Sequence, residues 1–347
     1  MSQFISNTTG ILLFRQLAAA TRSNLSYREI LEILSKDSEM FGRDTLAVDA
    51  LARQLADGGA LSSALLRLPE LVAAETAELV RAAEDQRSLA QILDAIANDY
   101  TELEQRKISI RGALSWPLTI LAIAAVLVAM MMIFVIPAFK EMYSSFGSDL
   151  PAPTLIIIAI SDFMVSWWWI IVFLIVAFVM LKRKKKIPQG MVLFAERILL
   201  SIPFARKYLV QAFAARTISW IQVAYNNPPL MLAALRYLRA TTAFLSLELC
   251  LLNLEVRLAN STPLSQALFD LDPLPKRLAL FMQLGEKNKD IDGALALIAD
   301  FSESERISKL AGFERWLTLC IYIILGITVG LFVIGMYMPI FKMGQAI

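Results

Sequence analysis

The 347-residue chain is 57% hydrophobic and only 18% charged, with a mean hydropathy of +0.58, so it is too apolar for a typical soluble protein. Its net charge of +2 indicates no polyanionic partner, and nucleic acid is therefore not expected. Because the chain has no histidine and its cysteines, Cys250 and Cys320, lie far apart, a disulfide scaffold, a metal site and histidine catalysis are all unexpected.

Residues 1–111 are predicted to form a cytoplasmic helical domain. The N-terminus lacks a basic start, a long apolar run and a cleavage site, so it does not resemble a signal peptide. Leu89, Leu93 and Ile96 are spaced by four and three, which predicts the buried stripe of a helix. The alternating pattern of strands is nearly absent. The sequence therefore predicts an all-α protein.

Three later segments carry no charged residue: 112–139, 163–181 and 316–341. A helix that crosses a bilayer needs ~20 apolar residues. A buried core helix is the alternative, but soluble helices of this length usually have a polar face, and these have none. We therefore expect a polytopic membrane protein with three transmembrane helices.

The charges beside the second apolar segment predict the orientation. A basic run that starts with Lys182, Arg183 and Lys184 follows this segment directly, whereas the loop 140–162 carries a net charge of −2. The positive-inside rule places the run in the cytoplasm and the loop outside. Because the run lies beside a span, we interpret it as a topology anchor or a lipid headgroup contact rather than a nucleic-acid site.

An internal repeat connects the two halves of the chain. At an offset of 202 residues, AEDQRSLAQILDAIAND (83–99) aligns without a gap with GEKNKDIDGALALIADF (285–301). The same offset pairs Pro137 with Pro339 and Phe139 with Phe341. Chance similarity of two helical, Leu- and Ala-rich segments is the alternative, but the constant register indicates duplication. We expect two tandem-related helical bundles.

Two repeated glutamates are the most prominent polar positions. Glu84 and Glu286 recur at what the pattern predicts is the same helix start, where they could contact a partner or the other copy. The alternative is a favourable placement of a carboxylate near a helix N-terminus, worth ~0.3–1 kcal/mol. Thr262 followed by Pro263 predicts a helix N-cap with proline at the first helical position.

The order of bundle, span, short loop, span, basic run, second bundle and last span resembles the F-domain platform family. Its members are inner-membrane core proteins of type IV pilus and type II secretion machines. The resemblance rests on FAARTISWIQVAYNNPPLMLAALRYL, GEKNKDIDGALALIADF and the terminal GLFVIGMYMPIFKMGQAI, with AEDQRSLAQILDAIANDY and ALSWP in the first half. The first copy departs from the family's Gly-Glu pair with Ala83-Glu84, and Ser88 and Asp290 stand where a glycine is common.

The resemblance implies seven segments along the chain. They are the first cytoplasmic F domain (1–111), span one (112–139), a periplasmic loop (140–162), span two (163–181), the basic anchor with the second cytoplasmic F domain (182–315), span three (316–341) and a periplasmic tail (342–347).

The resemblance also implies partners: a cytoplasmic assembly ATPase, major and minor pilins, other inner-membrane assembly proteins and a second copy of the chain. The short N-terminus favours a type IVb-like pilus system, with a type II secretion platform as the alternative. No GxxxxGK[ST], HExxH or GxSxG motif is present, so we expect no catalytic residue and no cofactor, and the partner would supply ATP hydrolysis. A transporter would need polar or broken spans. A membrane scaffold unconnected with pili would fit the same topology.

The candidate contact residues follow from these expectations. Partner contacts are assigned to Glu84, Glu286, Lys182, Arg183 and Lys184. The pilin track at the outer ends of the spans is assigned to Pro137, Phe139, Pro339 and Phe341. The prolines could be hinges, but we expect them to terminate their helices at the membrane surface, where proline's missing donor costs little.

Overall fold

Every regular element that the structure describes is a helix. The structure is a computed structural model, and it describes residues 5–35, 44–55, 59–131, 134, 137, 201, 203–242 and 244–344. The predicted loop (140–162), the predicted second span (163–181) and the basic run that follows it lie outside the described residues.

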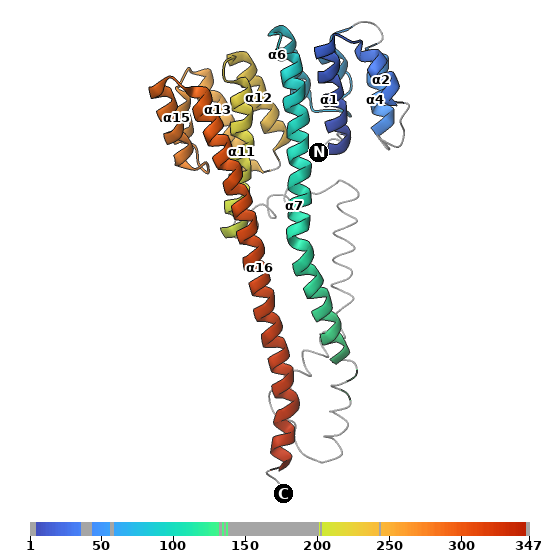
Figure 1. Cartoon of the computed structure of the whole chain (residues 1–347), viewed down its shortest axis with the longest axis vertical. Coiled ribbons are helices and arrows are strands. Elements are labelled where there is room, and N and C mark those ends of the chain that lie inside the picture. Colours follow the sequence, from blue (N-terminus) through green and yellow to red (C-terminus); the bar gives the residue numbers. More distant parts are fainter. Residues whose placement is uncertain are drawn as a thin grey trace. The chain divides into compact units, whose positions relative to one another are not determined.

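The helices of the described ranges form two sets of six (Figure 1). The first set consists of α1 (Asn7–Ser23), α2 (Tyr27–Ser35), α4 (Thr45–Gln54), α5 (Leu61–Leu66), α6 (Ala74–Asp85) and α7 (Leu89–Met130). The second set consists of α11 (Pro203–Ala224), α12 (Pro228–Thr241), α13 (Leu245–Ala259), α14 (Leu264–Phe269), α15 (Lys276–Asn288) and α16 (Ile291–Gly344).

The two sets repeat the same order of helices. Helices α6 and α15 begin at positions 74 and 276, and α7 and α16 begin at 89 and 291, so both pairs are 202 residues apart. Helices α5 and α14 begin at 61 and 264, which is an offset of 203. The register of the sequence repeat is therefore also the register of the helices.

The chain divides into two compact units, of which the first contains residues 1–109 and 193–310. One continuous apolar core in this unit takes side chains from both sets of helices. Leu93 and Ile96 of α7 and Leu295 and Ile298 of α16 are fully buried, and Leu89 is partly buried against the same core, which confirms the predicted stripe. Burying such a side chain stabilises the fold by ~1.5–3 kcal/mol. Helix α6 also packs against α12, so the two sets share an interface.

The second unit contains residues 110–192 and 311–347, and its described helical parts are strongly apolar. Large side chains here are exposed: Leu118 is 60% exposed and Ile327 is 59% exposed. Among the described residues, two helices contain a stretch long and apolar enough to cross a membrane, one within Leu89–Leu127 and one within Ile291–Gly330. Apolar surface of this extent is compatible with lipid rather than with water.

Prolines lie inside both long helices. Helix α7 continues through Pro117, and α16 continues through Pro339 as far as Gly344. The prediction that Pro339 terminates its helix is therefore wrong. A proline inside a soluble helix costs ~3 kcal/mol because it removes a donor and crowds the preceding turn. Membrane helices tolerate it, because neighbouring groups and local adjustments satisfy the freed carbonyl.

Candidate functional site

Glu84 caps a neighbouring helix of the first set. It lies in the last turn of α6 and accepts two hydrogen bonds from Ser62, near the start of α5. The backbone N–H of Ser62 donates to Oε1 at 3.2 Å, and the Ser62 hydroxyl donates to Oε2. The first N–H groups of a helix have no partner within the helix, and Ala60 at the N-cap supplies none. Glu84 therefore provides the missing acceptor.

Glu286 repeats this arrangement in the second set. The backbone N–H of Ser265 donates to Glu286 Oε1 at 3.0 Å, and the Ser265 hydroxyl donates to Oε2. The predicted Thr262 cap is wrong, because Pro263 occupies the N-cap of α14 without a side-chain bond. Both glutamates end one helix and cap another, so the predicted position at a helix start is also wrong. We call these two pairs the Ser–Glu clasps.

The turn that follows each clasp is also conserved between the copies. Arg87 and Lys289 have φ angles of 55° and 57°, in the left-handed region. The next N–H bonds back across the turn, from Ser88 to the Ala83 carbonyl at 3.0 Å and from Asp290 to the Gly285 carbonyl at 3.0 Å. This is the pattern of a Schellman helix end, here followed directly by the long helix.

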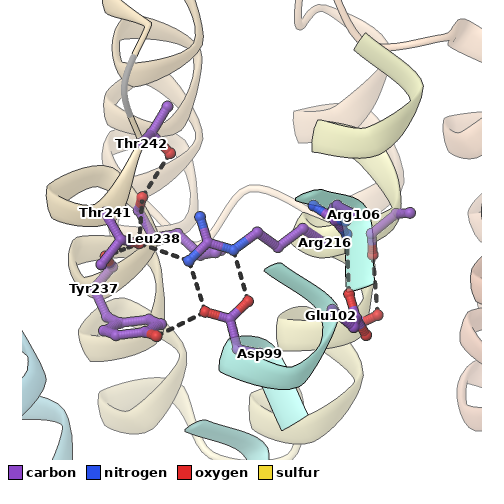
Figure 2. A network of polar contacts seen from close by, with 10 residues as sticks. Asp99, Glu102, Arg106, Arg216, Tyr237, Leu238, Thr241 and Thr242 are labelled. Atoms are coloured by element: carbon purple, nitrogen blue, oxygen red, sulfur yellow. Dashed lines mark hydrogen bonds and ion pairs between the residues drawn. The ribbon is translucent and has the colours of Figure 1, made fainter. Parts of the chain in front are cut away.

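A buried ion pair joins the two sets of helices (Figure 2). Asp99 of α7 lies against Arg216 of α11 and Tyr237 of α12. Arg216 donates from Nε and Nη2 to the two carboxylate oxygens, each at 2.7 Å, and the Tyr237 hydroxyl donates to Oδ2 at 2.7 Å. Arg216 Nη2 also donates to the Thr241 hydroxyl at 2.7 Å. We call these four residues the inter-set network.

The inter-set network is almost free of solvent. The side chains of Arg216 and Asp99 are 8% and 3% exposed. Burial raises the pKa of Asp99, but the charge of Arg216 and the hydrogen bonds from Arg216 and Tyr237 outweigh it and leave the pKa below its ordinary value. Burial lowers the pKa of Arg216, and the charge of Asp99 more than reverses this. Both groups therefore stay charged at neutral pH.

The chemistry of the network favours a structural link over a ligand site. A cavity of about 160 Å³ borders Asp99 and Arg216, which is below the ~300–1,000 Å³ of typical ligand pockets. One turn further along α7, Glu102 accepts a hydrogen bond from Arg106 at 2.9 Å (Figure 2). No group of His, Cys, Asp and Glu that could hold a metal ion occurs within the described ranges.

Sequence reasoning missed the inter-set network, although the repeat contained a signal for it. Asp99 follows Ile96 at a spacing of three, so an acid falls on the apolar stripe of α7. The gapless alignment also pairs Asp99 with Phe301, and the same offset pairs Arg216 with Phe14. A buried acid and a buried base that both break the repeat could have been proposed as partners.

The other predicted site residues are less fully described. Lys182, Arg183, Lys184 and Phe139 lie outside the described residues. Pro137 is exposed and helical, whereas Pro339 and Phe341 lie within α16. Their assignment to a pilin track, like the assignment of partner contacts to Glu84 and Glu286, stays a prediction.

Comparison with known proteins identifies the repeat. The chain matches the family described as type II secretion system (T2SS), protein F, over residues 13–137 and again over 231–339. The two matches end at Pro137 and Pro339, which are 202 residues apart. One family therefore describes both sets of helices.

Several similar proteins extend over nearly the whole chain. The type IV pilus assembly protein TapC of Aeromonas hydrophila is 26% identical over 337 residues, which cover 97% of this chain and 81% of TapC. The type IV pilus assembly protein PilC of Pseudomonas aeruginosa is 22% identical over 339 residues, 97% of this chain and 90% of PilC. The type II secretion system protein F of Vibrio cholerae is 29% identical, but only over 164 residues, 47% of this chain and 40% of that protein.

Proposed function

Because this chain belongs to the type II secretion system protein F family, we propose that it is the inner-membrane platform protein of a type IV pilus assembly machine. The observation that carries this proposal is the similarity over 97% of the chain to proteins named for type IV pilus assembly. Two helices are long and apolar enough to cross a membrane. They and the two six-helix sets agree with a membrane-anchored protein that also has a large helical unit.

The proposed task is to couple a cytoplasmic assembly ATPase to pilin extraction and fibre growth. The first compact unit is the docking body, and its two sets offer two similar surfaces. The inter-set network supports a rigid-body transfer of motion, because its buried charges favour one packing of the two sets. The chain itself would carry out no catalysis, and ATP hydrolysis would occur in the partner.

The proposed topology places the N-terminus in the cytoplasm and the C-terminus in the periplasm. It needs span two, 163–181, to cross the membrane and the basic run after it to lie in the cytoplasm, as the charge distribution predicts. Pilins would enter beside the outer ends of the spans, near Pro137, Phe139, Pro339 and Phe341. The protein would act as a homodimer or a higher oligomer.

Glu286 is the better of the two glutamates for a test of ATPase contact. Besides its clasp, it lines a surface pocket of about 600 Å³ together with Gln283 and Asp270. We expect Glu286→Lys to weaken co-purification of the ATPase with the full-length protein. Ser265→Ala is the matched control, since it removes the hydroxyl bond of the clasp but keeps the charge of Glu286. If both variants lose the ATPase equally, or neither does, Glu286 is not a contact residue.

Deletion of the gene tests the proposed function. Surface pili would be imaged and secreted proteins assayed in the same strains, with the intact gene returned as a control. Loss of pili with secretion intact is the expected result. The partial match to the Vibrio cholerae protein favours a type II secretion platform as the second candidate. Loss of secretion alone would assign the protein to that system, and no change in either would refute both.

A further inference from the structure

A basic pocket lies in the second set of helices, close to where its chain enters the apolar stretch. The pocket has a volume of about 490 Å³, and its lining includes four cationic side chains and no carboxylate. The four cations are Arg206 and Lys207 of α11, Arg277 of α15 and Lys309 of α16. The volume falls within the ~300–1,000 Å³ of small-molecule sites. Like charges repel one another here, so an anion would stabilise the arrangement.

The cations are poorly compensated within the described ranges. Arg277 forms an ion pair with Glu305 and donates to Gln211 Oε1 at 3.3 Å, but its buried Nε–H has no hydrogen-bond acceptor among the described residues. Arg206, Lys207 and Lys309 form no ion pair with any described residue. An oxyanion with several acceptor oxygens would satisfy these donors, because phosphate accepts charge-assisted hydrogen bonds from both arginine and lysine.

Most of the pocket's cations are not repeated at the aligned positions of the first set. At an offset of 202, Lys207 aligns with Ile5, Gln211 with Thr9 and Arg277 with Glu75. Ile5 belongs to the apolar core, and the Thr9 hydroxyl donates to Asp44 at 2.7 Å. Lys309 aligns with Lys107, which forms an ion pair with Glu104 in the first set. The other three cations of the cluster therefore have no cationic counterpart at the aligned positions.

The position of the pocket along the chain indicates which anion could reach it. Lys309 precedes Trp316, the first residue of the charge-free stretch, by seven residues of the same helix. A helix rises ~1.5 Å per residue, so Lys309 lies ~10 Å along the helix from this stretch. That distance is comparable to the Debye length, over which anionic lipids of the cytoplasmic leaflet attract basic side chains.

We propose that the pocket of Arg206, Lys207, Arg277 and Lys309 binds the phosphate of an anionic phospholipid headgroup from the cytoplasmic leaflet. The inference rests on the membrane location of the chain and on no other part of the proposed function. The bound headgroup would fix the second set, and not the first, to the membrane surface.

The test measures lipid retention by the full-length protein. The protein would be purified in detergent with equal amounts of phosphatidylglycerol and phosphatidylcholine, and bound lipids would be counted by native mass spectrometry. The test variant carries Arg206→Gln, Lys207→Gln and Lys309→Gln. The control carries Arg67→Gln, Arg81→Gln and Lys287→Gln, three exposed cations outside the pocket that change the net charge equally. Both variants keep the basic run at Lys182, so lipid bound by that run would not contribute to a difference between them.

We expect the test variant to retain at least about tenfold less phosphatidylglycerol than the wild type, since each cation near an anionic surface contributes about fivefold to the affinity. The control should behave as the wild type, and both should keep the wild-type melting temperature in pure detergent. Equal retention by test and control variants would overturn the proposal.

Two further outcomes would also overturn the lipid assignment. If inorganic phosphate raises the melting temperature of the wild type as much as phosphatidylglycerol does, the pocket is a site for free phosphate. If lipid retention is unchanged but the test variant no longer co-purifies the ATPase, the pocket is a protein-docking surface. Normal piliation of the test variant would leave the platform function intact, and so the two proposals fail separately.

Discussion

The two six-helix sets share a backbone plan but differ in the side chains that complete it. Both have a Ser–Glu clasp, a left-handed residue after it and a long helix that leaves the bundle. They differ at Ala83 and Gly285, at Ser88 and Asp290, and at Asp99 and Phe301. The clasp and the turn after it are shared, whereas the side chains that pack across this turn, that begin the long helix and that join the two sets differ. Duplication preserved the local fold and allowed the packing surfaces to diverge.

The largest effect should come from breaking the inter-set network, which the repeat does not duplicate. Asp99→Ala leaves the Arg216 charge buried without a partner, and we expect a loss of about 3–5 kcal/mol in the free energy of unfolding. Denaturant unfolding of the full-length protein would measure it. Asp85→Ala, on an exposed acid of α6, is the control and should be nearly neutral.

An apolar replacement sharpens this prediction. Asp99→Leu combined with Arg216→Met and Tyr237→Phe removes the charges together, as the aligned Phe301 and Phe14 do in the other copy. We expect this variant to lie within ~2 kcal/mol of the wild type, since well-packed apolar groups can replace a buried pair. A loss as large as that of Asp99→Ala would show that the cost does not come from an unpaired charge.

Acid should remove the contribution of Asp99 selectively. Its pKa is lower in the folded protein than in the unfolded chain, so the folded state holds the proton less tightly. The stability that it contributes is therefore complete above the unfolded pKa of ~3.9 and is lost as the pH falls from there through the folded pKa. The stability difference between wild type and Asp99→Asn should stay constant from neutral pH to about pH 5 and shrink below about pH 4. A difference that shrinks already near neutral pH would contradict this account.

The contact between α15 and α16 should tolerate a change in side-chain volume less well than the contact between α6 and α7. A Cβ added to Gly285 would lie 2.4 Å from the Ala294 Cβ, so Gly285→Ala should cost about 1–3 kcal/mol through overpacking. The reverse change in the first set, Ala83→Gly, removes a buried methyl and should cost about 1 kcal/mol. Melting temperatures of the two variants would test this order, and an equal or reversed order would show that the α15–α16 contact is not the tighter of the two.

The two clasps should contribute equally to the free energy of unfolding. Ser62→Ala and Ser265→Ala each remove the hydroxyl donor to a glutamate, and each should cost about 1 kcal/mol, typical of a lost helix cap. Unfolding by denaturant would compare them directly. A difference between them above ~1 kcal/mol would mean that one glutamate has stabilising contacts that the other lacks.

The smallest effect is expected where α16 begins. Asp290 Oδ1 accepts the Gly293 N–H at 3.0 Å, and a Cβ at Gly293 would meet the Asp290 carboxylate. Gly293→Ala should displace this cap but gain about as much helix propensity, leaving a change below ~0.5 kcal/mol. Asp290→Ala with Gly293 intact should cost more, about 1 kcal/mol. If Gly293→Ala is the more damaging of the two, the carboxylate has no room to move.

Sequence patterns predicted the elements of the fold better than the contacts between them. The all-helical class, the stripe at Leu93 and Ile96 and the repeat register at 202 residues depend on local periodicity, and the structure agrees with them. The clasps were mispredicted because Glu84 and Glu286 act on a neighbouring helix, and sequence spacing favours local caps such as Thr262. The end of α16 was mispredicted because Pro339 was expected to terminate its helix at the membrane surface, whereas a membrane helix can continue through a proline.

The spacing of residues along the sequence does not by itself identify which residues are partners in the inter-set network. Asp99 and Arg216 are 117 residues apart, and no periodic pattern links α7 to α11. The assigned contacts with an ATPase and with pilins also depend on surfaces of other chains, which one sequence does not contain.

The most direct test of the account is piliation of a deletion strain that carries Asp99→Ala at a membrane level matched to the wild type. The apolar triple variant would be the companion strain, and secretion would be assayed alongside. If the two sets transmit motion as one joined body, the Asp99→Ala strain should have few or no pili, the apolar triple variant should recover them, and secretion should be unaffected. Wild-type numbers of pili on the Asp99→Ala strain would contradict the central claim.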